Sequence, residues 1–86
     1  MLKILYQVTS ATMPSLLHLV GDADAILFRQ DACYLLQRSS QWPATQLYVL
    51  AADANFRQVD VPANVQAIDD LTWVSLCAAA NKVITC

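Results

Sequence analysis

Cys33 is the residue of this chain whose type and setting come closest to those of a reactive group. It follows a short apolar run at residues 25–28 and then Asp31, a residue type that often caps a helix, so we expect it in the first turn of a helix. The helix dipole there lowers a thiol pKa, which would favour nucleophilic attack or persulfide transfer. However, Asp31 adds negative charge, Ala32 and Leu35 are apolar, and no histidine follows. We interpret Cys33 as a packing residue and keep a reactive thiol as the alternative.

The other two cysteines are Cys77, inside an apolar segment, and Cys86, the last residue of the sequence. Three widely spaced cysteines without a Cys-x-x-Cys pair argue against a disulfide scaffold, a zinc site and a thioredoxin-type centre. We expect Cys77 in the core and Cys86 on a mobile end, where a thiol could accept sulfur. Reduced thiols are typical of a cytosolic protein.

The remaining polar residues do not form a recognisable catalytic set. The neighbouring acids Asp22 and Asp24 are interpreted as turn residues, and Asp69 and Asp70 as helix-start residues. The single glycine excludes a glycine-rich phosphate loop. His18 is expected on the surface. We therefore expect no catalytic residue, no metal and no cofactor.

The composition is unusually apolar for so short a chain. Of 86 residues, 57% are apolar and only 14% are charged, whereas average domains are about 45–50% apolar and about 25% charged. A domain of this size hides only about 60–65% of its unfolded surface. The surplus predicts either a membrane segment or a surface covered by other subunits.

The membrane and nucleic-acid interpretations are not favoured. Polar residues interrupt every apolar stretch before it reaches about 18 residues. Gln7, Ser10 and His18 likewise interrupt the segment that could resemble a signal peptide, so we expect a cytoplasmic protein. The net charge of −2, with five lysines and arginines, lacks the basic footprint of direct nucleic-acid binding.

Short apolar runs alternate with helix-like segments along the chain. This alternation predicts a three-layer α/β/α sandwich with a mainly parallel sheet of about five strands. The nearly all-apolar strand 46–51 is expected at the sheet centre. A hairpin formed by residues 25–29 and 32–37 is the competing interpretation. The predicted strands are 2–8, 25–29, 46–51, 65–68 and 82–86, and the predicted helices are 13–20, 32–38, 54–58 and 71–80, with caps at Thr12, Asp31, Asp53 and Asp69.

Two apolar features indicate contacts beyond the chain's own core. The helix 71–80 is apolar nearly all round, and a helix apolar on every side is buried on every side, so we expect another chain to cover it. Trp42 lies in the predicted loop 39–45 and is expected either to fold back as a lid or to dock on a partner.

Four segments in order resemble the DsrH/TusB family of sulfur-relay subunits, part of the DsrE-like superfamily. The family's opening strand is matched by MLKIL at residues 1–5, and its Leu-Leu-x-Gln/Glu-Asp-Gly-x-Tyr signature by LFRQDACY at 27–34. YVLAAD at 48–53 and IDDLTWVSL at 68–76 match its later motifs. Some DsrH-type members carry a cysteine in the first helix where Leu16 stands here, so the chain resembles the TusB branch more closely.

The resemblance implies a single DsrE-like domain over residues 1–86. It also implies an accessory subunit, not an enzyme, in a TusBCD-type hetero-oligomer with TusC-like and TusD-like chains. Such a complex passes persulfide sulfur from a TusA-like donor to a TusE-like acceptor, toward 2-thiolation of the tRNA wobble uridine. The alternatives are a sulfur carrier using Cys33 and a DsrH-like subunit of a dissimilatory sulfur pathway. The candidate partner-contact residues are Gln30, Asp31, Tyr34, Trp42, Trp73 and Leu76.

Overall fold

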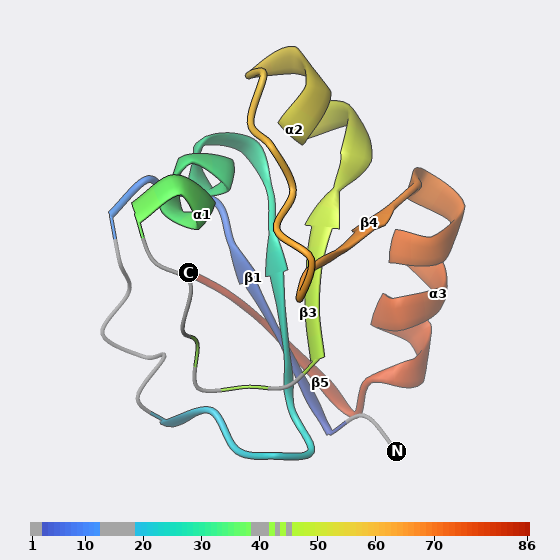
Figure 1. Cartoon of the computed structure of the whole chain (residues 1–86). Coiled ribbons are helices and arrows are strands. Elements are labelled where there is room, and N and C mark those ends of the chain that lie inside the picture. Colours follow the sequence, from blue (N-terminus) through green and yellow to red (C-terminus); the bar gives the residue numbers. More distant parts are fainter. Residues whose placement is uncertain (1–2, 13–18, 39–41, 43, 45) are drawn as a thin grey trace.

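A computed structural model describes residues 3–12, 19–38, 42, 44 and 46–86. Five parallel strands form one sheet in the order β4-β3-β2-β1-β5, as Figure 1 shows. This confirms the predicted α/β class with a parallel sheet. The elements are β1 (Ile4–Val8), β2 (Ala25–Phe28), the 3-10 helix η2 (Gln30–Tyr34), α1 (Leu35–Arg38), β3 (Gln46–Leu50), α2 (Ala51–Phe56), β4 (Gln66–Ile68), α3 (Asp70–Ala79) and β5 (Lys82–Thr85).

The central strand is β2, not β3, so the expectation that residues 46–51 occupy the sheet centre is wrong. All four residues of β2 are fully enclosed, and the strand pairs with β1 on one side and β3 on the other. The short β4 lies beyond β3, and the chain then returns through α3 to add β5 beyond β1. This return shifts the centre of the sheet from β3 to β2.

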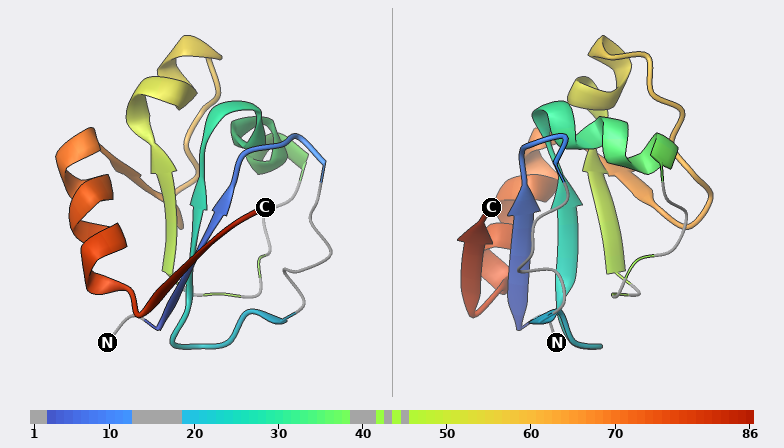
Figure 2. Two further views of the ribbon diagram at one scale, coloured as in Figure 1. Left: turned by 180° about the vertical axis from the view of Figure 1, so that it is seen from behind. Right: turned by 90° about the vertical axis from the view of Figure 1, so that its left-hand side faces the viewer.

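The two faces of the sheet are covered by different elements. Tyr6, Ile26, Phe28 and Val49 pack with η2 and α1 on one face. The other face, which includes Leu5, is covered by α3. The right-hand view of Figure 2 shows α1 in front of the sheet and α3 behind it. Burial on both faces explains why the strands are almost continuously apolar.

The helix after β2 begins earlier than predicted. Its first turn is η2, so Asp31 lies inside the helix and does not cap it, and Arg29 holds the cap position without a side-chain bond. The cause is Gln30, which turns the chain with a φ of 51° two residues after β2 ends. The helical turn after β2 also rules out the hairpin between residues 25–29 and 32–37.

The later helices are partly as expected. α2 starts at Ala51, directly after β3, so Asp53 lies in its first turn and does not cap it. Asp69 does cap α3, because its Oδ1 accepts the backbone N–H of Thr72 at 2.8 Å. The predicted helix 13–20, which includes Leu16 and His18, falls mainly outside the described residues. In the part of the chain that is described, no helix has both the length and the apolar character needed to cross a membrane.

Candidate functional site

The inner face of α3 anchors the helix to the sheet. Trp73, Leu76, Cys77 and Ala80 recur at the i, i+3, i+4, i+7 spacing of one helix face, and all four pack on the core that contains Leu5. Each of them is only partly buried, and α3 itself has no fully buried residue. The helix is therefore attached along one stripe, and its remaining circumference faces outward.

A second apolar stripe runs along the outer side of α3. It consists of Leu71, Val74 and Ala78, again at helical spacing, and we call it the outer stripe. Leu71 is 79% exposed and Val74 63% exposed. The described residues thus leave these side chains uncovered, while the sheet already occupies the other side of the helix. Apolar side chains therefore lie on both the inner and the outer side of α3, as predicted. That another chain covers the outer side stays a prediction.

Gln7, Arg29 and Trp73 form a polar cluster between α3 and the sheet. Gln7 is buried, and its Oε1 accepts both the indole N–H of Trp73 at 3.2 Å and Nη1 of Arg29 at 3.3 Å. The guanidinium carbon of Arg29 lies 4.0 Å from the centroid of the Trp73 ring. One amide oxygen therefore fixes both the indole and the guanidinium that stacks on it.

A second cluster joins η2 to α2 at the carboxyl end of the sheet. Arg57 Nε lies 3.2 Å from Asp31 Oδ1, and Arg57 Nη1 lies 3.8 Å from Asp53 Oδ1. Asp53 Oδ2 also accepts the backbone N–H of Gln30 at 2.9 Å. These bonds hold the chain reversal after β2 against the helix that follows β3.

Cys33 lies in the core beneath η2 and is fully enclosed. Burial is the main cause that raises the pKa of its thiol from 9.0 to about 11, and the Asp53 carboxylate raises it further, whereas Arg57 opposes the shift. A thiol with this pKa is almost entirely protonated at neutral pH, so the setting does not favour a nucleophilic thiolate.

The other two cysteines both differ from what the sequence suggested. The expectation that Cys77 lies in the core is wrong: it is only partly buried where it packs toward the sheet, because α3 contacts the sheet along one face. The backbone N–H of Cys86 donates to the Gln7 carbonyl at 2.8 Å, and the Cys86 carbonyl accepts the Thr9 N–H at 3.1 Å. Burial also raises the pKa of the Cys86 thiol. The expectation of a mobile end at Cys86 is therefore wrong, because strand-like pairing with β1 continues to the last residue.

The six predicted partner-contact residues do not form one patch. Gln30, Asp31 and Tyr34 are exposed on η2. Trp42 folds back on the opposite side of the sheet from α3, where its ring meets Phe28 edge-on at 4.8 Å between centroids. The remaining two, Trp73 and Leu76, lie between α3 and the sheet. Contact of these residues with a partner stays a prediction.

Two features of this region escaped the sequence interpretation. The outer stripe could have been separated from the inner one, because Leu71, Val74 and Ala78 are more than a quarter of a turn away from Trp73 and Leu76 on a helical projection. The clusters around Arg29 and Arg57 carry no such signal, since their members come from distant segments that only the fold brings together.

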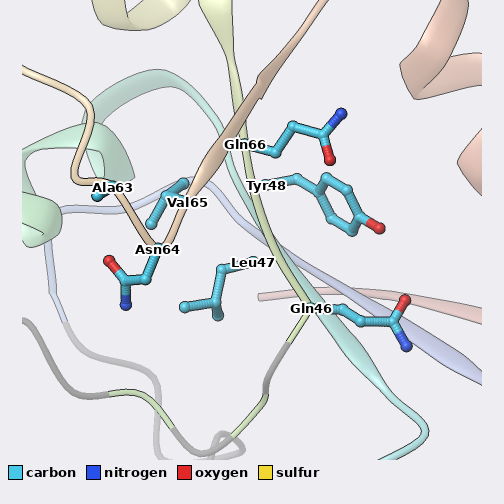
Figure 3. Close-up of a pocket in the computed structure, with 7 residues that line it drawn as sticks. All are labelled: Gln46, Leu47, Tyr48, Ala63, Asn64, Val65 and Gln66. Carbon is cyan, nitrogen blue, oxygen red and sulfur yellow. The ribbon is translucent and has the colours of Figure 1, made fainter.

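A hollow of about 500 Å³ lies at β3, β4 and the segment before β4 (Figure 3). In Figure 3, the side chains of Gln46, Tyr48 and Gln66 project to one side of the strands and that of Leu47 to the other. The seven lining residues carry no thiol, imidazole or carboxylate, which leaves this hollow without obvious chemistry. Its lining consists of Gln46, Leu47, Tyr48, Ala63, Asn64, Val65 and Gln66.

The described residues offer no metal site either. Among the described residues, no three histidine, cysteine or acidic side chains gather closely enough to hold a metal ion. The candidate site is therefore a surface, made of the outer stripe of α3 and the Gln7–Arg29–Trp73 cluster beside the inner stripe.

Comparison with known families agrees with the resemblance drawn from the motifs. The model of the family described as DsrH like protein matches residues 7–83, nearly the whole sequence. No curated protein matches the chain in sequence. The family match indicates a sulfur-relay subunit and does not distinguish the TusB branch from its relatives. The chain belongs to the DsrH-like family.

Proposed function

We propose that this chain is a non-catalytic, cytoplasmic structural subunit of a TusBCD-type sulfur-relay complex, and that it docks through the outer stripe of α3. The observation that carries the proposal is the exposure of Leu71 and Val74 on a helix whose opposite face already packs on the sheet. Full burial of one such side chain contributes about 1.5–3 kcal/mol. A partner that covers Leu71 and Val74 would therefore gain at most two such contributions.

The setting of the thiols supports a structural role. Cys33 is enclosed and its pKa is raised to about 11, so the group best placed in sequence for sulfur chemistry is poorly suited to it. In the proposed complex the sulfur would pass through the cysteine of the TusD-like partner, and this chain would hold its companions in position. The partners would be TusC-like and TusD-like chains, supplied by a TusA-like donor and served by a TusE-like acceptor.

Co-expression with TusC-like and TusD-like chains from the same genome, followed by light scattering, tests the assembly. We expect a hetero-oligomer with the wild-type chain and its loss in the double variant Leu71→Ser, Val74→Ser. Ala79→Ser is the matched control, because it also places a hydroxyl on an exposed position of α3 but lies outside the outer stripe. A wild-type chain that remains monomeric beside both partners would contradict the proposal.

The tRNA role requires a separate measurement. We expect the chain, expressed with its partners in a bacterial strain that lacks the TusB subunit, to restore 2-thiouridine at the wobble position, measured by nucleoside mass spectrometry. Cys33→Ala should restore it equally well if Cys33 is structural. Loss of thiolation in a correctly folded Cys33→Ala variant would favour the sulfur-carrier alternative. Assembly without thiolation would favour the DsrH-like role in a dissimilatory pathway.

A further inference from the structure

The positive charge of Arg29 has no counter-charge among the described residues. Both ion pairs found among the described residues are made by Arg57, and no described carboxylate lies within 4.0 Å of the Arg29 guanidinium. The Arg29 side chain is nevertheless only partly exposed. An ion that is partly removed from water costs free energy unless another charge compensates it, so an isolated arginine in this setting calls for a physical reason.

The guanidinium is held rigidly, with one edge left over. Its face stacks on Trp73 at 4.0 Å, and Nη1 donates to Gln7 at 3.3 Å. Nε is enclosed and has no hydrogen-bond partner. Nη2 is not among the enclosed unpaired atoms and makes no bond to a described residue, so its N–H groups remain available to a further partner.

Arg29 also occupies the position where parallel sheets commonly meet ligands. It directly follows β2, and its backbone N–H donates to the Val8 carbonyl at 2.9 Å, which places it at the carboxyl ends of β1 and β2. The next residue, Gln30, has a φ of 51°, which is unfavourable for a residue other than glycine. Such local strain is concentrated at functional sites in proteins.

We propose that Arg29 binds a carboxylate, supplied by an aspartate or glutamate side chain of a partner subunit. A carboxylate supplies the missing negative charge and can accept charge-assisted hydrogen bonds from the free N–H groups of the guanidinium. Sulfate or phosphate, being tetrahedral and doubly charged, is usually bound by several donors from more than one direction. A protein-borne carboxylate is favoured over a free one because Trp73, which positions Arg29, belongs to the same helix as the outer stripe.

This inference rests on the proposed function, since it names the chemistry of the surface that a partner brings to α3. Trp73 and Gln7 are positioning residues in this arrangement. They fix the orientation of the guanidinium before a partner binds, which reduces the conformational entropy lost when the ion pair forms.

The test compares the dissociation constants of the TusC-like and TusD-like subunits for four forms of this chain, at low and high salt. Arg29→Gln should weaken binding by about 10- to 100-fold and reduce its salt dependence. Arg29→Lys should also weaken binding, because an ammonium keeps the charge but loses the planar pairing. Arg38→Gln, an exposed arginine on α1, is the matched control and should bind as the wild type does. Thermal melts establish that each variant is folded.

The possible outcomes separate the two proposals. If the partners bind and Arg29→Gln behaves like Arg38→Gln, the carboxylate site is overturned while the structural role stands. If neither partner binds the wild-type chain, the structural role fails and the carboxylate site with it. A titration of the isolated chain with sulfate and sulfite, followed by the Arg29 Nε–H and Trp73 Nε1–H resonances, covers the remaining case. Saturable binding of sulfate or sulfite that is lost in Arg29→Gln would show that Arg29 binds a free sulfur oxyanion and not a partner carboxylate, and would overturn the proposal.

Discussion

The indole N–H of Trp73 donates to Oε1 of Gln7 at 3.2 Å, and this bond joins two residues 66 positions apart in the chain. It spans the interface between α3 and the sheet, beside the apolar contacts that Trp73, Leu76 and Cys77 make with the core. Because the same oxygen accepts from Arg29, Gln7 serves two donors from one buried position. The orientation of α3, and with it that of the outer stripe, therefore depends on a polar residue in the sheet.

Replacing Gln7 by methionine should lower the free energy of unfolding by about 1–3 kcal/mol, because the Trp73 N–H and the Arg29 Nη1 then lose a buried acceptor. Methionine keeps the length of the side chain, so little of the effect would come from lost volume. Urea denaturation measures the change. Gln37→Met on the exposed side of α1 is the matched control and should change stability by less than about 0.5 kcal/mol. Equal stability of the two variants would mean that the cluster does not anchor α3.

The φ of 51° at Gln30 makes a second prediction possible. Gln30→Gly should raise the free energy of unfolding by about 0.5–1 kcal/mol, because glycine adopts the left-handed region without the Cβ clash, although it gains more freedom in the unfolded chain. The same denaturation measurement applies. Gln37→Gly, in the helical region of α1, should instead destabilise by about 0.5–1 kcal/mol. A loss of stability in both variants would contradict the strain assigned to Gln30.

The sequence predicted the fold class well, because the buried strands of a parallel sheet leave a strong local signal. Runs such as residues 25–28 and 46–50 are apolar on both faces, and helix-like segments separate them. The strand order was harder to predict from local patterns, since it depends on how the chain returns through α3. Asp31 shows the limit of capping rules: the residue type was suitable, but Gln30 reversed the chain one residue earlier and placed Asp31 inside the helix.

The candidate site was predicted only in outline. The sequence indicated that the last helix is apolar all round, and from this a partner surface was expected. It did not reveal that Trp73 turns inward to Gln7, whereas Leu71 turns outward, because the direction of each side chain depends on how α3 is laid on the sheet. The isolation of Arg29 from every described carboxylate is likewise a property of the assembled fold, not of its neighbours in the chain.

The raised pKa of Cys33 predicts a loss of stability at alkaline pH. The folded state retains the thiol proton to about pH 11, whereas the unfolded state loses it near pH 9. The protonated Cys33 thiol therefore contributes its full share of the free energy of unfolding below pH 9. This share, at most about 3 kcal/mol, is lost as the pH rises toward 11. Denaturation at a series of pH values measures the loss. The raised pKa of Tyr6 also makes the stability fall at high pH. The effect of Cys33 is therefore isolated by comparing the wild type with Cys33→Ala at each pH.

Cys33→Ala should be less stable than the wild type at pH 7, because it leaves a small cavity, but the difference should narrow between about pH 9 and pH 11. Alkylation of the native protein gives an independent readout. At pH 7.5 we expect iodoacetamide to modify the partly exposed Cys77. The enclosed Cys33 should stay unmodified until the chain unfolds. Rapid modification of Cys33 in the native state would show an accessible thiolate and would revive the sulfur-carrier alternative.

The two leucines of α3 allow folding and docking to be separated. Leu76 packs toward the sheet, so Leu76→Ala should lower the free energy of unfolding by about 1–2 kcal/mol, less than the loss at a fully buried site. Leu71 is 79% exposed, and Leu71→Ala should change the stability of the isolated chain by less than about 0.5 kcal/mol. In the presence of the TusC-like and TusD-like chains the order should reverse, with Leu71→Ala weakening assembly more than Leu76→Ala does. Parallel denaturation and sedimentation measurements on the two variants check this reversal, and an outer-stripe variant that assembles normally would move the docking surface away from α3.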